Sequence, residues 1–389
     1  MKEPIYFDYA AATPLDPEVK RTMDETASIF ANPSANYSLG REAREKLNEA
    51  KKRIGLVIGA TADEIFLTSG GTEANNLTIF GIARANRKYG KHLITVETEH
   101  ASILSCCDQL KKEGFRVSFC PVDNYGQIRL GNLKKLISNQ TTLISLSLAS
   151  SEIGTIQSIS HISKIIEQVR EKRSKKGNKT PIYLHSDGSA AAGLISLGVN
   201  RLGIDALSLN ASKIYGPKGS GTLFVKKGVD IQPIIYGGGQ NNDLRSGTEN
   251  LTGAVGLAEA LNLAEKYRNK EEKRLRELRD YLIEKIKEIY PKVIINGAVK
   301  KRLASNINLS FEGLDGEDLM YRFDSKGIIV ATGAACSASS DQPNRALMAI
   351  GRNKSQAQGS LRVTLGRFTT KAEINKFLLT SKEILSDLK

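Results

Sequence analysis

The sequence has no tryptophan and only four cysteines, four methionines and four histidines among its 389 residues. Cys106, Cys107, Cys120 and Cys336 are spaced neither as a zinc site nor as the disulfide framework of a small secreted domain. No apolar run approaches the roughly 18 residues of a membrane-spanning helix. The first residues include acidic residues and proline too early for a signal peptide. These absences predict a cytoplasmic protein with no metal site and no membrane association.

The charge is unbalanced, because 56 lysines and arginines face 42 acidic residues, a formal net charge of +14. The densest basic run, REKRSKKGNK at 170–179, is expected to be a solvated helix end and loop. The remaining excess is dispersed and is not interleaved with aromatic residues, as a platform for single-stranded nucleic acid requires. We expect no direct nucleic-acid contact, although a basic surface could attract an acidic protein partner or tRNA.

Short β-rich runs alternate with helical patterns between residues 64 and 226. Seven such runs are present: EIFLT, HLITVE, RVSFCPV, TLISLSL, PIYLHS, IDALSLN and GTLFVK. This alternation favours a mostly parallel sheet covered on both faces. From residue 254 a long charged amphipathic helix and further short strands indicate a smaller unit. We predict an α/β fold, with a mostly parallel seven-stranded sheet in a large domain at 16–253. A small α+β domain is predicted from 1–15 and 254–389.

Three strand ends carry groups that can meet at one edge of this sheet. In TSGGTEANN, a Gly-Gly turn begins a helix at Gly71 and Thr72, where free amides favour a phosphate, although tight packing alone also uses glycine. Asp187 follows another strand, with helix capping as the alternative. Lys213 follows the next strand, with a solvated surface charge as the alternative. Amine, carboxylate and anion site together are what pyridoxal phosphate requires.

Three further residues are candidates for chemistry. His100 follows the strand HLITVE at the same edge and could stack on a pyridinium ring and move protons; a structural role is the alternative. Cys336 lies in a run of small residues that leads into a loop, where an accessible thiol can be a nucleophile. Arg362 offers a planar fork for a substrate carboxylate, with an interdomain salt bridge as the alternative. The other cysteines are expected to be buried hydrophobic residues.

These motifs resemble the class V, fold type I aminotransferases and, within them, the NifS/IscS-like cysteine desulfurases. The resemblance covers nearly the whole chain through YFDYAAATPLDPEV, TSGGTEANN, ETEH, EIGTIQ, KIYGPKGSG, GGGQNNDLRSGTEN, GAACSAS and LRVTLGRFTT. It implies a homodimeric pyridoxal-phosphate enzyme that converts L-cysteine to L-alanine. The sulfur would pass as a persulfide to an acceptor protein, for iron–sulfur cluster assembly or tRNA thiolation.

The resemblance also implies a role for each matching position. Lys213 would carry the Schiff base, and Asp187 would pair with the pyridine nitrogen. His100 would stack on the ring and transfer protons. Arg362 would bind the L-cysteine carboxylate, and Cys336 would attack the sulfur from a mobile loop. The remaining candidates would hold the cofactor and, in the case of Ser151, also the substrate: Gly71, Thr72, Ser151, Asn210, Ser212 and, from the second subunit, Thr248.

The sequence departs from the family pattern around this site. Ser150 and Ser151 stand where the family usually has two asparagines, and Ala190 stands where a glutamine bonds the cofactor's ring oxygen. Ser212 replaces a histidine that touches the phosphate, and Tyr37 replaces an earlier histidine. Hydrogen bonds to charged groups contribute about 1.5–3 kcal/mol each. Losing two without compensation would weaken cofactor binding by roughly a hundredfold or more.

Two alternatives to a cysteine desulfurase stay open at this point. Selenocysteine lyase shares the fold and most of the site. A degenerate paralogue would bind a partner protein without turnover. The departures favour the degenerate paralogue, whereas the intact Lys213, Cys336 and Arg362 oppose it.

Overall fold

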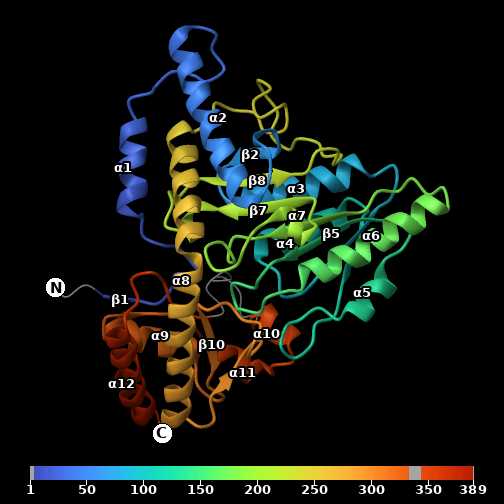
Figure 1. Cartoon of the computed structure of the whole chain (residues 1–389). Helices are drawn as coiled ribbons and strands as arrows, with labels where there is room; N and C mark the ends of the chain where they lie inside the picture. Colours follow the sequence, from blue (N-terminus) through green and yellow to red (C-terminus); the bar gives the residue numbers. More distant parts are fainter. Residues whose placement is uncertain (1–3, 333–342, 389) are drawn as a thin grey trace.

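A seven-stranded sheet lies at the centre of the larger part of the molecule (Figure 1). In the computed structural model, which describes residues 4–332 and 343–388, its strand order is β2-β8-β7-β6-β5-β3-β4. The strands are β2 (Ile65–Thr68), β3 (His92–Thr95), β4 (Arg116–Phe119), β5 (Thr141–Ser147), β6 (Tyr183–Asp187), β7 (Ala206–Asn210) and β8 (Gly221–Val225). Strand β8 runs antiparallel to β2 and β7, and the other pairs are parallel. The predicted mostly parallel seven-stranded sheet is confirmed.

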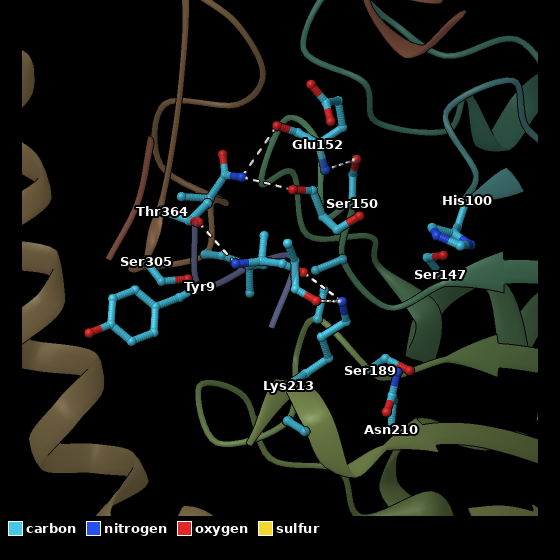
Figure 2. A pocket seen from close by; sticks show the side chains of 18 of the residues that line it. Tyr9, His100, Ser147, Ser150, Glu152, Ser189, Asn210, Lys213, Ser305 and Thr364 are labelled. Atoms are coloured by element: carbon cyan, nitrogen blue, oxygen red, sulfur yellow. Dashed lines mark hydrogen bonds between the residues drawn. The ribbon is translucent and has the colours of Figure 1, made fainter. Parts of the chain in front are cut away.

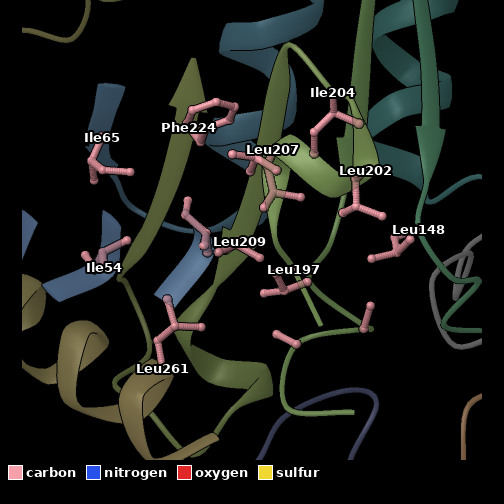
Figure 3. Close-up of a cluster of buried hydrophobic side chains, with 14 of the residues drawn as sticks. Ile54, Ile65, Leu148, Leu197, Leu202, Ile204, Leu207, Leu209, Phe224 and Leu261 are labelled. Atoms are coloured by element: carbon pink, nitrogen blue, oxygen red, sulfur yellow. The ribbon is translucent and has the colours of Figure 1, made fainter. Parts of the chain in front are cut away.

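Helices cover both faces of this sheet, which explains why its strands are apolar along their whole length. Every residue of β5 is buried, and its side chains alternate between two cores. Leu143 packs in a cluster with the helices α3 (Gly71–Ala85) and α4 (Ala101–Lys112). Ile144 belongs to the cluster formed with α2 (Ser38–Ile58) and α6 (Ile159–Lys175). Figure 3 shows part of this second cluster, where Ile54 and Leu261 lie near side chains of the sheet. The helices of this part are α1 (Pro17–Thr26), α2 (Ser38–Ile58), α3 (Gly71–Ala85), α4 (Ala101–Lys112), α5 (Leu130–Leu136), α6 (Ile159–Lys175) and α7 (Val199–Leu202).

A second, antiparallel sheet lies below the first in Figure 1, with the order β12-β13-β10-β9. Its core includes Phe323 stacked on Phe377, with Phe7 against the edge of the same ring. The strands are β9 (Ile294–Ile295), β10 (Asn306–Ser310), β12 (Ala331–Thr332) and β13 (Ser360–Thr364), and β1 (Ile5–Tyr6) pairs separately with β11 (Ile328–Ile329). The helices are α9 (Gly316–Ser325), α10 (Arg345–Ala349), α11 (Lys354–Gln358) and α12 (Lys371–Asp387).

Helix α8 (Leu251–Ile289) runs along both parts of the molecule (Figure 1). Leu257 and Leu261 pack in the core of the large sheet, whereas Leu282 and Ile286 pack in the second core. The domain boundary placed before residue 254 stays a prediction, because this helix contributes to both cores. None of the helices among the described residues has the length and apolarity to span a membrane.

One arginine of the basic run at 170–179 is buried. Arg173 is 5% exposed and donates to the carbonyl oxygens of Ser138, Thr141, Thr180 and Pro181. The expectation of a solvated helix end and loop is therefore wrong at this residue, because four backbone acceptors bind its guanidinium in the interior.

The prediction for three cysteines is confirmed. Cys106, Cys107 and Cys120 are buried, and burial raises each thiol pKa, to about 12 for the first two and about 11 for Cys120.

Candidate active site

A cavity of about 620 Å³ lies between the carboxyl edge of the large sheet and the second sheet (Figure 2). Most of the candidate residues line it: Gly71, Thr72, His100, Ser151, Asp187, Asn210, Lys213 and Arg362. Ser212 and Thr248 are not among the described residues of its lining, and Cys336 lies outside the described residues. Apart from these three, the structure therefore gathers in one place the residues that the motifs singled out.

Lys213 ends the short helical turn η2 (Ala211–Lys213), which directly follows β7. Its Nζ donates hydrogen bonds to the carbonyl oxygens of Ala10 and Ala11, at 2.7 and 2.6 Å (Figure 2). The N-terminal segment is attached to this turn, since Thr13 N donates to the carbonyl oxygen of Ser212 at 2.8 Å. The amine therefore faces the interior of the cavity, and the alternative of a solvated surface charge does not hold.

Asp187 is the last residue of β6 and is 9% exposed. Its Oδ2 accepts from Asn75 Nδ2 at 2.8 Å, and its Oδ1 accepts from the backbone N–H of Ser189 at 2.9 Å. The second bond closes a local turn, and no described helix begins at Asp187, so the alternative of helix capping does not hold, and the carboxylate lines the cavity. Asn75 was missed by sequence reasoning, although it lies within the TSGGTEANN motif.

His100 is the N-cap residue of α4, and its ring borders the cavity. Its Nδ1 accepts from the backbone N–H of Ser102 at 3.1 Å and lies 2.8 Å from Ser102 Oγ. The ring is exposed to the cavity, and desolvation by the surrounding protein is the main reason that the pKa of His100 lies below its ordinary value. Asp187 opposes this decrease in pKa, whereas the positive charges of Lys213 and Arg362 add to it.

Glu99 precedes this histidine and is a second carboxylate of the cavity wall. It accepts hydrogen bonds from the backbone N–H of Ser147, at 2.8 Å, and from the Ser147 hydroxyl. Burial raises the pKa of Glu99 to about 7, against the effect of these two bonds, and the charge of Asp187 raises it further. Sequence reasoning assigned no role to Glu99.

The start of α3 has the features of an anion-binding site. Its N-cap, Gly70, has φ +150° and ψ −176°, a conformation essentially restricted to glycine, and it supplies no side-chain cap to the first amides. Gly71 and Thr72 follow in the cavity wall. Asn210 lies beside them, and its Oδ1 accepts from the hydroxyl of Ser212 at 3.0 Å. An uncapped helix start near an amine and a buried carboxylate fits the phosphate, aldehyde and ring nitrogen of pyridoxal phosphate.

Arg362 lies on β13, at the end of the cavity formed by the second sheet, with its side chain 8% exposed. One terminal nitrogen donates to Glu152 Oε2 and the other to Asp8 Oδ1, each at 3.0 Å. Asn308 donates to the second oxygen of Glu152 at 3.0 Å. Burial raises the pKa of Glu152, and Arg362 opposes that increase. Arg362 therefore forms the salt bridge that was considered as the alternative, and the same guanidinium also lines the cavity. Its two acidic partners, Asp8 and Glu152, were not predicted.

The fold is that of fold type I pyridoxal-phosphate enzymes. The family model Aminotransferase class-V matches residues 5–377, and the chain belongs to that family. It is 43% identical over 390 residues to "Cysteine desulfurase IscS" of Dictyoglomus turgidum, covering 100% of this chain and 96% of the relative. The cofactor predicted from the motifs, pyridoxal phosphate, is that of the family.

Solved structures agree with this assignment. A structure named "NIFS-LIKE PROTEIN" superimposes with a TM-score of 0.89 at 31% identity, covering 98% of this chain and 99% of that one. A structure described as "SspA in complex with cysteine" has a TM-score of 0.78 at 29% identity, covering 94% of this chain and 100% of that one. The resemblance inferred from the motifs is therefore confirmed over nearly the whole chain.

Proposed function

We propose that this protein is a cysteine desulfurase, which converts L-cysteine to L-alanine and transfers the sulfur to an acceptor protein. One observation supports this most strongly: Lys213, Asp187 and Arg362 line a single cavity, so an amine, a carboxylate and a carboxylate-binding guanidinium are available to one small amino acid. The names of the relatives agree, since the matched protein of Dictyoglomus turgidum is called a cysteine desulfurase.

Each end of the cavity has a proposed task. When bound, pyridoxal phosphate supplies the electron sink that weakens bonds at the carbon atoms of the amino acid. Lys213 would hold its aldehyde carbon, Asp187 would keep its ring nitrogen protonated, and the first amides of α3 would bind its phosphate. Arg362 would orient the substrate through its carboxylate. Cys336, which lies outside the described residues, would take the sulfur as a persulfide.

We also propose a cytoplasmic homodimer in which Thr248 of the partner subunit completes the phosphate site. Thr248 is exposed in this chain and is not part of its own described cavity lining, as expected for a residue that acts in trans. The acceptor would serve iron–sulfur cluster assembly or tRNA thiolation.

A spectral titration followed by an assay tests this function. Addition of pyridoxal phosphate should give the visible band of a lysine Schiff base. L-cysteine with a reductant should then yield equal amounts of sulfide and alanine. Borohydride reduction and peptide mapping should find the pyridoxyl label on Lys213, and Lys213→Ala should lose both label and turnover. A protein with no band at saturating cofactor would instead be the non-catalytic paralogue, and faster turnover of L-selenocysteine would indicate the lyase.

A further inference from the structure

A chain of hydrogen bonds connects Asp187 to His100 through two buried residues. Asn75 Nδ2 donates to Asp187 Oδ2 at 2.8 Å and lies 2.9 Å from Ser102 Oγ. Ser102 in turn meets His100 Nδ1 with both its hydroxyl, at 2.8 Å, and its backbone N–H, at 3.1 Å. Asn75 is 1% exposed and Ser102 is 8% exposed, so water does not replace these partners.

The orientation of the Asn75 amide follows from its acidic neighbour. An ionised carboxylate only accepts hydrogen bonds, so the atom of Asn75 that faces Asp187 is the NH₂ nitrogen and not the oxygen. This nitrogen carries two hydrogens, and its second contact is Ser102 Oγ. Ser102 Oγ is therefore the acceptor in that contact.

The direction of the next bond follows from counting hydrogens. The Ser102 hydroxyl has one hydrogen, and with its oxygen accepting from Asn75, that hydrogen points to His100 Nδ1. The backbone N–H of Ser102 points to the same nitrogen. Two donors aimed at Nδ1 require its lone pair, so the single proton of the neutral imidazole is on Nε2.

We propose that Asn75 and Ser102 are positioning residues that hold neutral His100 as the tautomer with its proton on Nε2. The imidazole then offers the cavity an N–H donor and no free lone pair. This inference deepens the proposed function, because the resemblance assigns His100 to proton transfer. In this tautomer Nε2 already carries its proton, so a proton exchanged between the neutral ring and the cavity leaves from Nε2 and is not taken up there. Among the residues that the structure describes, the charged groups that act on the ring are Asp187, Lys213 and Arg362, with Asp187 connected to it through Asn75 and Ser102.

The proposal is tested by ¹⁵N NMR of the pyridoxal-phosphate-loaded protein with ¹⁵N-labelled histidine. The chain has only four histidines, and His100→Gln identifies the signals of this ring. Above its pKa, His100 should show a protonated Nε2 and a bare Nδ1. In Ser102→Ala one donor to Nδ1 is lost, so a fraction of the rings should carry the proton on Nδ1 instead. The pKa of His100 should rise by about 0.5–1, the equivalent of one neutral hydrogen bond.

Ser105→Ala is the matched control, because Ser105 lies on the same helix α4 with an exposed side chain. It should leave both the tautomer and the pKa of His100 unchanged. A wild-type His100 with its proton on Nδ1 overturns the proposal, and so does a Ser102→Ala protein with wild-type tautomer and pKa. The wild-type spectrum tests the proposed tautomer even if the Ser102→Ala variant does not fold. It does not depend on turnover of L-cysteine, so this inference and the proposed function can fail separately.

Discussion

The two ends of the cavity hold their charged groups in different ways. At the end formed by the large sheet, Lys213 donates to backbone carbonyl oxygens and Asp187 accepts from an amide side chain and a backbone N–H. At the end formed by the second sheet, Arg362 is bound by two carboxylates, those of Asp8 and Glu152. The hydrogen-bond partners of Asp187 are thus neutral dipoles, whereas those of Arg362 include opposite charges.

This difference has a consequence for ligands. A carboxylate held by neutral dipoles keeps most of its charge for a bound molecule, which suits an ionic contact with a resident cofactor. A guanidinium that already binds two carboxylates gives a third carboxylate a weaker net attraction. Such a site suits a substrate that must bind and leave in every cycle.

The largest effect is expected from removing the charge at the second end. Arg362→Leu leaves Asp8 and Glu152 partly buried without their guanidinium, and loss of one partner of a buried ion pair is strongly destabilising. The free energy of unfolding should fall by about 3–5 kcal/mol. Binding of L-cysteine should be lost in the same variant. Urea unfolding of the folded variant measures the loss of stability, and the KM for L-cysteine measures the loss of substrate binding.

The matched control for this variant is Arg322→Leu, which breaks the exposed pair with Asp318 on α9. An exposed helical pair contributes at most about 1 kcal/mol, so this change should be small. Equal losses of stability in the two variants would contradict the view that Arg362 is the centre of a buried network.

Much of the large-sheet end could be predicted from the sequence, for a physical reason. Short apolar runs indicate buried parallel strands, and the carboxyl ends of such strands meet at one edge. Asp187 ends a strand and Lys213 closely follows the next one, so their positions in the chain also fix their positions in space. Asn75 and Ser102 could not be predicted, because their roles depend on side-chain directions that strand and helix patterns do not contain.

The contacts at the end formed by the second sheet were harder to predict from the sequence. Asp8 and Arg362 are 354 residues apart, and they meet because β1 joins β11 and Asp8 bridges to Thr364. No local pattern encodes this long-range contact. Glu152 was visible only as one letter of a motif, and its bond to Arg362 requires the two sheets to face each other.

A second prediction concerns the buried carboxylate at the large-sheet end. Burial raises the pKa of Glu99 to about 7 from 4.5, so the folded protein favours the protonated form. The stability that this proton contributes is fully present below pH 4.5 and is lost as the pH rises through 7. The loss amounts to about 3 kcal/mol. Glu99→Gln should remove this dependence, and the free energy of unfolding measured from pH 4.5 to 8 checks it.

Glu97→Gln serves as the comparison for this experiment, because Glu97 lies two residues away in a largely exposed pair with Arg345. It should keep the pH dependence of the wild type. If Glu99→Gln shows the wild-type dependence as well, the raised pKa of Glu99 is excluded as its source.

The smallest expected effect concerns cofactor affinity at the large-sheet end. Ala190 lies half-buried in the cavity wall, at the position where the family places a glutamine. Ala190→Gln should supply one hydrogen bond to the cofactor and tighten pyridoxal phosphate roughly tenfold, measured by absorbance titration. Ala190→Leu has a similar volume but no amide, and it should bring no gain. If leucine tightens binding equally, the gain comes from filling space. If the glutamine variant also changes the KM for L-cysteine, the two ends of the cavity are coupled and do not act independently.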